Sequence, residues 1–185
     1  MGQYYKPVNV DKMQFVYSHA YDNGLKLMEH SWIGNKFMVV VESLIAKGGD
    51  WYGDRIVWAG DYADEEPKSS LQQTETSNLY MQMKDENEVK PPVSKTKYRY
   101  LVNMDNGEFV DMDKVPVSDT YDGWDFRIHP LSLLTVESNG RGCGDYHGKN
   151  KKKKEKLVGR WCRKRITIQN EKPEDMKELI FDLVE

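Results

Sequence analysis

Residues 98–112 read YRYLVNMDNGEFVDM, which is the strongest hairpin signal in the chain. Aromatic and β-branched residues alternate with others on both sides of a central turn, as expected where side chains point in turn to the two faces of a sheet. The turn Asp105-Asn106-Gly107 contains residue types that tolerate a left-handed backbone. We therefore predict two antiparallel strands, 98–104 and 108–112.

Further segments on either side have the same β-prone composition, and they are residues 3–8, 13–17, 55–59 and 157–168. The apolar run 126–136 is either a strand or a short buried helix. Strands and helices do not alternate regularly in this order, which argues against a doubly wound parallel sheet.

Two segments have the apolar spacing of helices, 36–47 and 173–183. Asn35 is a suitable N-cap for the first, and Gly48-Gly49 can end it in a left-handed conformation. Pro173 fits the first turn of the second. The fold class that we predict is α+β, with a mainly antiparallel sheet flanked by these two helices.

The length of 185 residues is typical of one domain, so we expect a single domain over 1–185. A polar excursion at 65–92, with one exposed helix near 77–84, and a lysine-rich loop at 149–156 interrupt its regular elements. No internal repeat is evident beyond a short loop pattern.

The composition is that of a folded, polar protein. The hydrophobic share is 38% and mean hydropathy is −0.78, but 5 Trp, 11 Tyr and 5 Phe argue against a disordered chain. Two cysteines make neither a disulfide framework nor a four-cysteine metal site. No apolar run approaches the roughly 18 residues of a membrane span. We therefore expect a cytoplasmic protein with no membrane association.

The net charge of −3 conceals an asymmetry. Residues 149–165 hold ten of the 27 Lys and Arg and one of the 30 Asp and Glu, which gives +9. The other 17 basic and 29 acidic residues give −12. Nucleic acid binding through 149–165 is a secondary hypothesis, because no aromatic residues lie among the lysines to stack on bases.

A glycine, an aspartate and an aromatic residue recur side by side, in Gly49-Asp50-Trp51, Gly60-Asp61-Tyr62 and Gly144-Asp145-Tyr146. Tyr121-Asp122-Gly123-Trp124 is a looser version. Such loops at one end of a sheet form a pocket for a ring-bearing ligand, or they are simply turns with aromatic lids. In the first interpretation the ring-stacking and polar residues are Trp51, Trp58, Asp61 and Tyr62.

Residues 139–148 are the leading candidate for an anion site. Alternate glycines allow successive backbone N–H groups to converge, and Arg141 adds a forked donor. The alternative is a plain surface loop. The residues that we assign to the site are Gly140, Arg141, Gly142, Gly144, Asp145, Tyr146 and His147.

No catalytic or metal-binding motif is present. The four histidines lack the spacing of HExxH or any metal pair, and no EF-hand loop occurs. We assign no catalytic residue, no metal ligand and no cofactor. Whether the protein is an enzyme stays open at this point.

Three segments resemble a set of uncharacterised bacterial and phage-type proteins. They are the opening MGQYYKP, the run WAGDYAD at 58–64, and NGRGxGDY from Asn139. The likeness covers most of the chain. It implies no activity, so no functional residue is carried over from it.

The function that we predict is non-enzymatic binding of an anionic, ring-bearing small molecule such as a nucleotide, with sequestration by a phage-encoded protein as one use. A small hydrolase that uses His30 or His147 with carboxylates is an alternative, and a protein–protein inhibitor or adaptor is another. The sequence leaves the oligomeric state open.

Overall fold

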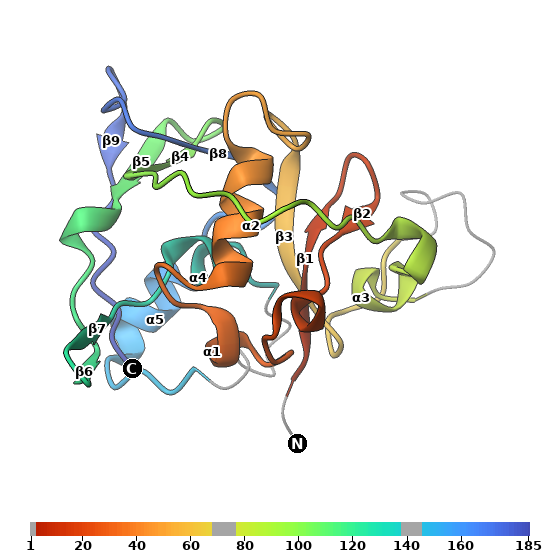
Figure 1. Ribbon diagram of the computed structural model, residues 1–185, viewed down its shortest axis with the longest axis horizontal. Coiled ribbons are helices and arrows are strands. Elements are labelled where there is room, and N and C mark those ends of the chain that lie inside the picture. The colour runs from red at the N-terminus through yellow and green to blue at the C-terminus, as the bar shows by residue number, and fades with distance from the viewer. Residues whose placement is uncertain (1–2, 68–76, 138–145) are drawn as a thin grey trace.

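The computed structural model describes residues 3–67, 77–137 and 146–185 (Figure 1). Its strands are β1 Tyr5–Asn9, β2 Gln14–Phe15, β3 Arg55–Gly60, β4 Tyr100–Asn103, β5 Glu108–Asp111, β6 Asp119–Tyr121, β7 Trp124–Phe126, β8 Lys164–Gln169 and β9 Lys177–Glu178. Its α-helices are α1 Leu27–His30, α2 Lys36–Ile45, α3 Leu79–Gln82, α4 Pro130–Thr135 and α5 Lys151–Leu157. Short 3-10 helices lie at Ser18–Tyr21, Asp85–Asn87 and Met112–Lys114.

The α+β prediction is confirmed. Seven strands form one sheet in the order β2-β1-β3-β8-β4-β5-β9, and its pairs are antiparallel except for β5 with β9. The predicted hairpin is the β4–β5 pair. Helix α2 runs across the front of the sheet (Figure 1) and begins where the Asn35 side chain accepts N–H bonds from Phe37 and Met38. Its apolar face, Leu44 included, lies in the main core.

The strand order is symmetric about the contact between β3 and β8. Reading outward, β3, β1 and β2 on one side correspond to β8, β4 and β5 on the other. Val8 on β1 lies opposite Phe15 on β2. Val102 on β4 lies opposite Phe109 on β5 in the equivalent register. The chain therefore contains two similar halves, which we define as residues 3–93 and 99–185.

The same turn closes the first hairpin of each half. Asn9 Oδ1 accepts hydrogen bonds from the backbone N–H groups two and three residues later, at 3.0 and 2.9 Å. Asn103 Oδ1 does the same at 3.0 and 3.1 Å. Each turn then uses one left-handed residue, Met13 with φ 51° or Gly107 with φ 61°. The local sequences, VNVDKMQFV and VNMDNGEFV, explain this identity.

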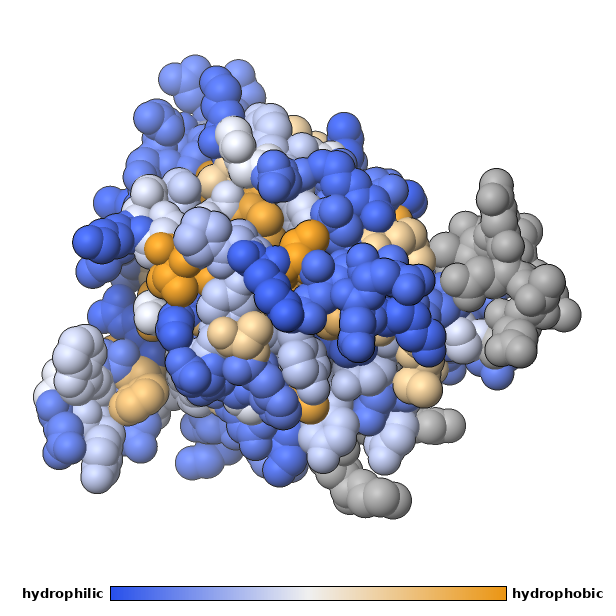
Figure 2. All heavy atoms as spheres, turned by 45° about the vertical axis from the view of Figure 1, so that its right-hand side comes forward, coloured by the Kyte–Doolittle hydropathy of each residue, from blue (hydrophilic) through white to orange (hydrophobic). Residues whose placement is uncertain are grey.

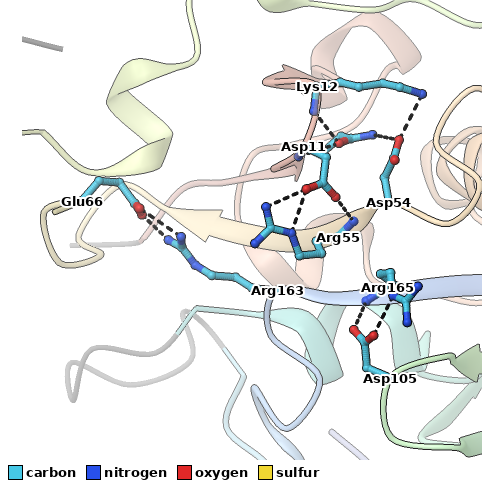
Figure 3. A network of polar contacts seen from close by, with 9 residues as sticks. Asp11, Lys12, Asp54, Arg55, Glu66, Asp105, Arg163 and Arg165 are labelled. Carbon is cyan, nitrogen blue, oxygen red and sulfur yellow. Dashed lines mark hydrogen bonds and ion pairs between the residues drawn. The ribbon is translucent and has the colours of Figure 1, made fainter. Parts of the chain in front are cut away.

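An aspartate in each turn binds an arginine on the inner strand (Figure 3). Asp11 accepts from the backbone N and Nε of Arg55 at 2.6 and 2.8 Å. Asp105 accepts from the same atoms of Arg165 at 2.8 and 2.6 Å. Arg55 and Arg165 lie directly opposite each other where β3 meets β8. Equivalent residues that face each other across an antiparallel pair place an approximate two-fold axis between them.

A buried tryptophan follows the helix in each half. The backbone N–H of Trp51 bonds to the penultimate carbonyl of α2 at 2.9 Å, and that of Trp161 bonds to the penultimate carbonyl of α4 at 2.7 Å. Trp51 Nε1 donates to Gln14 Oε1, and Trp161 Nε1 donates to Glu108 Oε2 in the equivalent place. Both rings are fully buried, so each anchors its helix to its hairpin.

The helices are exchanged between the halves. Thr167 Oγ1 on β8 donates to the carbonyl of Ile45, the last residue of α2, at 2.8 Å. Glu137, just after α4, donates its backbone N–H to the carbonyl of Trp58 on β3 at 3.0 Å. Each helix thus packs against the inner strand of the other half, which makes the two halves one interlocked sheet and core.

The prediction of a second helix at 173–183 is wrong. This segment contains β9, and Leu179 donates its backbone N–H to a β5 carbonyl at 2.7 Å. Leu179, Phe181 and Leu183 are buried, whereas Ile180 is 62% exposed. The apolar residues therefore alternate with a period of two, and the free edge of β5 favours the extended form. The first half has an equivalent edge contact, in which the backbone N–H of Val89 donates to the carbonyl of Phe15 on β2.

Two further expectations are corrected. The lysine-rich segment is not a loop but helix α5, which Asn150 caps through the N–H of Lys153. The described part of the polar excursion is not detached, since Leu79 and Met83 are buried against the far face of the sheet with residues of β1 and β3.

Candidate functional site

Trp51 and Trp58, the predicted ring-stacking residues, are fully buried. Trp51 donates to Gln14, and Trp58 Nε1 donates to His30 Nε2 at 3.0 Å. An indole enclosed by the core has no free face for a ligand ring. These two tryptophans therefore belong to the frame of the protein.

Asp61 and Tyr62 lie far from Trp51. Trp51 precedes β3 and Asp61 follows it, so the six residues of β3 hold them roughly 20 Å apart. Asp61 Oδ1 accepts the N–H of Tyr4 at 3.0 Å. Asp61 and Tyr62 line a hollow of 430 Å³ together with Asp64 and Glu65, whose carboxylates repel an anion. Trp51, Trp58, Asp61 and Tyr62 therefore do not form one stacking site.

Most of the glycine loop lies outside the described residues, including Gly140, Arg141, Gly142, Gly144 and Asp145. Its last two members are described. Tyr146 is buried in the main core, and its hydroxyl donates to the carbonyl of Val184 at 3.0 Å. His147 is exposed. The anion-binding role of Arg141 stays a prediction.

His30 is a structural histidine. It is fully buried, its Nε2 accepts from Trp58, and its Nδ1 lies 3.0 Å from the carbonyl of Gly24. The hydrogen bonds assign the Nδ1–H tautomer. Both ring nitrogens are therefore engaged, which leaves none to act as a general base.

The arginines of the basic segment are paired. Arg160 forms a two-pronged contact with Glu108, and Arg165 binds Asp105. Arg163 contacts both Glu66 and Glu137 (Figure 3 shows the first pair). Because these charges are neutralised within the sheet, they are poorly placed to hold a nucleic acid backbone.

Arg163 also lines a hollow of 420 Å³ with Glu137 and Cys162. Burial raises the pKa of Glu137, despite the nearby Arg163 guanidinium. Burial and then the Glu137 charge raise the pKa of the Cys162 thiol to about 12. A thiol with so high a pKa stays protonated at neutral pH and is a poor nucleophile.

The largest of these hollows is a groove of 600 Å³ where α2, residues 94–98 and the β6–β7 hairpin meet. Its size is within the usual range of small-molecule sites. Its apolar wall consists of Ile33, Val39, Tyr98, Met112 and Trp124. The groove lies at the junction of the two halves, with the linker between them as one wall.

Trp124 on the hairpin is 76% exposed, the most exposed large hydrophobic residue in the described chain. The hairpin projects beside the C-terminus at the lower left of Figure 1, and all residues of β6 and β7 are exposed. The face drawn in Figure 2 is mainly hydrophilic, with hydrophobic residues in small separate patches. Trp124 presents an exposed indole at the groove that it lines.

Three cations line the groove, Lys95, Lys97 and Arg127. Within the described ranges neither lysine ammonium is paired with a carboxylate, and Arg127 Nη1 makes only a 3.4 Å contact with the carbonyl of Asp113. Unpaired cations beside a ring face suit an anionic ligand that carries a ring.

Glu42 on α2 also lines the groove. Its Oε1 lies 2.9 Å from His129 Nε2, and both side chains are almost fully buried. His129 Nδ1 accepts the N–H of Leu131, so the imidazole is the neutral Nε2–H tautomer. The groove thus combines a cationic rim with one carboxylate at a buried position.

In the described ranges no three His, Cys, Asp or Glu side chains are grouped to share a metal ion. None of the helices described there is long and apolar enough to cross a bilayer. Comparison with protein-family models, curated proteins and solved structures finds no match.

Sequence reasoning missed the groove, although part of the signal was present. Tyr121-Asp122-Gly123-Trp124 is an Asp-Gly turn between aromatic residues, which predicts a hairpin. Lys95 and Lys97 gave no signal, because isolated lysines in a polar linker are common. Only the packing of α2 against the linker brings these segments together.

Proposed function

We propose that the protein binds an anionic, ring-bearing small molecule such as a nucleotide, without turnover, in the groove at the junction of its halves. The observation that carries the proposal is Trp124, which stands 76% exposed at the groove beside unpaired Lys95 and Lys97. A ligand ring that covers the indole gains stacking and apolar burial, and its anionic group meets the ammonium groups.

The hydrolase alternative has little support from the described histidines. His30 has both ring nitrogens engaged, and His147 has no neighbouring carboxylate to orient it among the described residues. Tyr146 belongs to the core rather than to a ligand-stacking face. Binding without chemistry is therefore the function that the geometry supports best.

An adaptor that binds another protein is the second candidate. The hairpin displays Tyr121 and Trp124 together with three aspartates, Asp119, Asp122 and Asp125. Exposed aromatic residues are enriched at protein interfaces, and the acidic residues favour a basic partner. This candidate uses Tyr121 and the aspartates of the hairpin, whereas the small molecule uses the groove that Trp124 lines.

The resemblance to bacterial and phage-type proteins extends the proposal to a physiological role. A protein that binds a nucleotide without consuming it lowers the free concentration of that nucleotide. Sequestration of a nucleotide in the cytoplasm of an infected bacterium is the role that we propose.

The test is a thermal-shift screen of nucleotides, followed by calorimetry on the wild type and on Trp124→Ala and Lys95→Ala. Each substitution is expected to weaken binding by about 1–3 kcal/mol, from a lost stacking or charged contact. Tyr121→Ala is a matched control, because it removes a strongly exposed aromatic residue of the hairpin that does not line the groove. Lys152→Ala on α5 is the matched control for charge.

Several outcomes contradict the proposal. If Trp124→Ala and Tyr121→Ala lose the same nucleotide affinity, and a basic protein is captured, the adaptor is favoured. Loss of binding only in Arg141→Ala places the site in the glycine loop. Turnover of the bound nucleotide by the wild type shows that the protein is an enzyme.

A further inference from the structure

Glu42 is a nearly buried carboxylate that lines the groove. Its side chain is 5% exposed, and within the described chain its hydrogen-bond donor is His129, a neutral imidazole. A carboxylate so placed has room for further donors, because several are needed to replace its hydration. Since Glu42 lines the groove, a ligand can supply such donors there.

The contacts that the two halves share do not include the Glu42–His129 pair. Counted back from Leu44 and Leu134, whose carbonyls receive the tryptophan N–H groups, Glu42 corresponds to Ser132 in the other half. By the same count, His129 corresponds to Val39. The two-fold related place thus holds neutral residues, so the carboxylate is an addition to the shared framework.

We propose that the groove recognises a guanine nucleotide, with the Glu42 carboxylate accepting the N1–H and N2–H donors of the base. This inference rests on the proposed function, since it names the ring that the groove binds. The base lies along the apolar wall that ends at Trp124, and its phosphate meets Lys95 and Lys97. Glu42 then gains further donors from the base, and His129 holds its other oxygen in place.

The hydrogen-bonding edge of the base decides between guanine and adenine. Guanine presents two adjacent N–H donors, which match the two oxygens or the two lone pairs of a carboxylate. Adenine presents an N1 acceptor at the same place, whose lone pair faces the carboxylate and leaves it unsatisfied. A site built around a buried hydrogen-bonding group rejects a ligand that lacks the matching partner.

The first experiment uses the wild type alone and compares GMP, IMP and AMP by calorimetry. GMP is expected to bind at least tenfold more tightly than AMP. IMP, which keeps the N1–H but lacks the 2-amino group, is expected to lie between them. Because no substitution is involved, this ranking does not depend on the folding of a variant.

The second experiment measures GMP and AMP binding to Glu42→Gln, an isosteric change. GMP affinity is expected to fall at least tenfold while AMP affinity is expected to rise, because the amide replaces one acceptor by a donor that adenine N1 can accept. Asp113→Asn is the matched control: Asp113 lines the same groove but is exposed and paired with Arg99. It is expected to leave the ratio of the two affinities unchanged.

The outcomes separate this inference from the function on which it rests. Binding of GMP and AMP with equal affinity, lost in Trp124→Ala, supports the groove and overturns the choice of guanine. A preference for GMP that survives in Glu42→Gln overturns the role of Glu42. Binding of no nucleotide at all overturns the proposed function itself.

Discussion

The two halves of the molecule share a frame but differ in one charged contact beneath each tryptophan. In the first half, Gln14 accepts from the indole, and the residue before the tryptophan is Asp50. In the second half, Glu108 accepts from Trp161 and also binds Arg160, which corresponds to Asp50. One half therefore uses a neutral acceptor, whereas the other uses an ion pair for the same anchor.

The difference teaches which residues the fold needs. The turn asparagines, the aspartate–arginine contacts and the buried tryptophans recur in both halves, so they hold the sheet and helices together. Among the residues that the structure describes, the β6–β7 hairpin and α5 occur in the second half only. Recurring residues therefore maintain the fold, and residues without a counterpart in the other half are the candidates for function.

The largest expected effect comes from removal of either tryptophan. Trp51→Ala and Trp161→Ala are each expected to lower the free energy of unfolding by about 3–5 kcal/mol, because a fully buried ring leaves a large cavity. Urea denaturation measures both values. Losses of unfolding free energy that differ by more than about 2 kcal/mol would show that the two tryptophans are not equivalent anchors.

The next effect concerns Arg163, which has a left-handed φ of 57° where the first half has Gly53 with φ 80°. Arg163→Gly relieves backbone strain but leaves Glu66 and Glu137 without their cation. Since breaking a partly buried pair costs more than the strain, we expect a net loss of about 2–3 kcal/mol. Thermal unfolding measures it.

Gly53→Ala is the matched control for strain alone, since nothing lies within 4 Å of the added methyl group. A loss of about 1–2 kcal/mol is expected there. A stabilised Arg163→Gly would show that the ion pairs contribute less than the strain costs.

A smaller effect is expected at the turns. Asn9 and Asn103 are fully buried, and each side-chain oxygen accepts two backbone hydrogen bonds. Asn9→Ala and Asn103→Ala are each expected to cost about 1–3 kcal/mol, from unsatisfied N–H groups. Asn103→Asp keeps the acceptor and is expected to cost less, whereas Asn9→Asp also loses the 2.8 Å hydrogen bond from Asn9 Nδ2 to Asp54 and places two carboxylates together. Equal losses of stability for Asn103→Ala and Asn103→Asp would argue against the turn role.

The smallest effect is a difference in pH dependence. The Arg160 contact lowers the pKa of Glu108 from its ordinary value of 4.5. Gln14, its counterpart in the first half, does not titrate and contributes no such pH dependence. A lowered folded-state pKa gives stability that is present above the unfolded value and is lost as the pH falls through the folded value. Glu108→Gln is therefore expected to be less stable than the wild type at pH 7, and this gap should narrow below about pH 4.5.

The reciprocal change sharpens the comparison. Gln14→Glu places a carboxylate where the first half has Asp50 instead of an arginine, so it is expected to destabilise at pH 7 and to recover on acidification. Denaturation midpoints from pH 3 to 8 measure both variants. A gap for Glu108→Gln that stays constant with pH would mean that the Arg160 contact does not contribute.

Local sequence patterns were sufficient to predict the elements whose hydrogen bonds join residues close in the sequence. The hairpin 98–112 follows from alternation and an Asp-Asn-Gly turn, and α2 follows from Asn35 and an apolar stripe. The helix prediction for 173–183 was wrong, because the apolar residues of this segment fit a helix and a strand alike. The free edge of β5 decided between them, and that edge is formed by residues distant in the sequence.

The sequence by itself determined the α+β class, the best hairpin and the first helix, because turns, caps and periodicity act over a few residues. Tertiary structure alone decided that the halves containing VNVDKMQFV and VNMDNGEFV interlock in one sheet. It also decided that Trp51 and Trp58 lie inside while Trp124 lies outside. The physical reason is that burial and the groove depend on which distant segments pack together, and no local pattern specifies that.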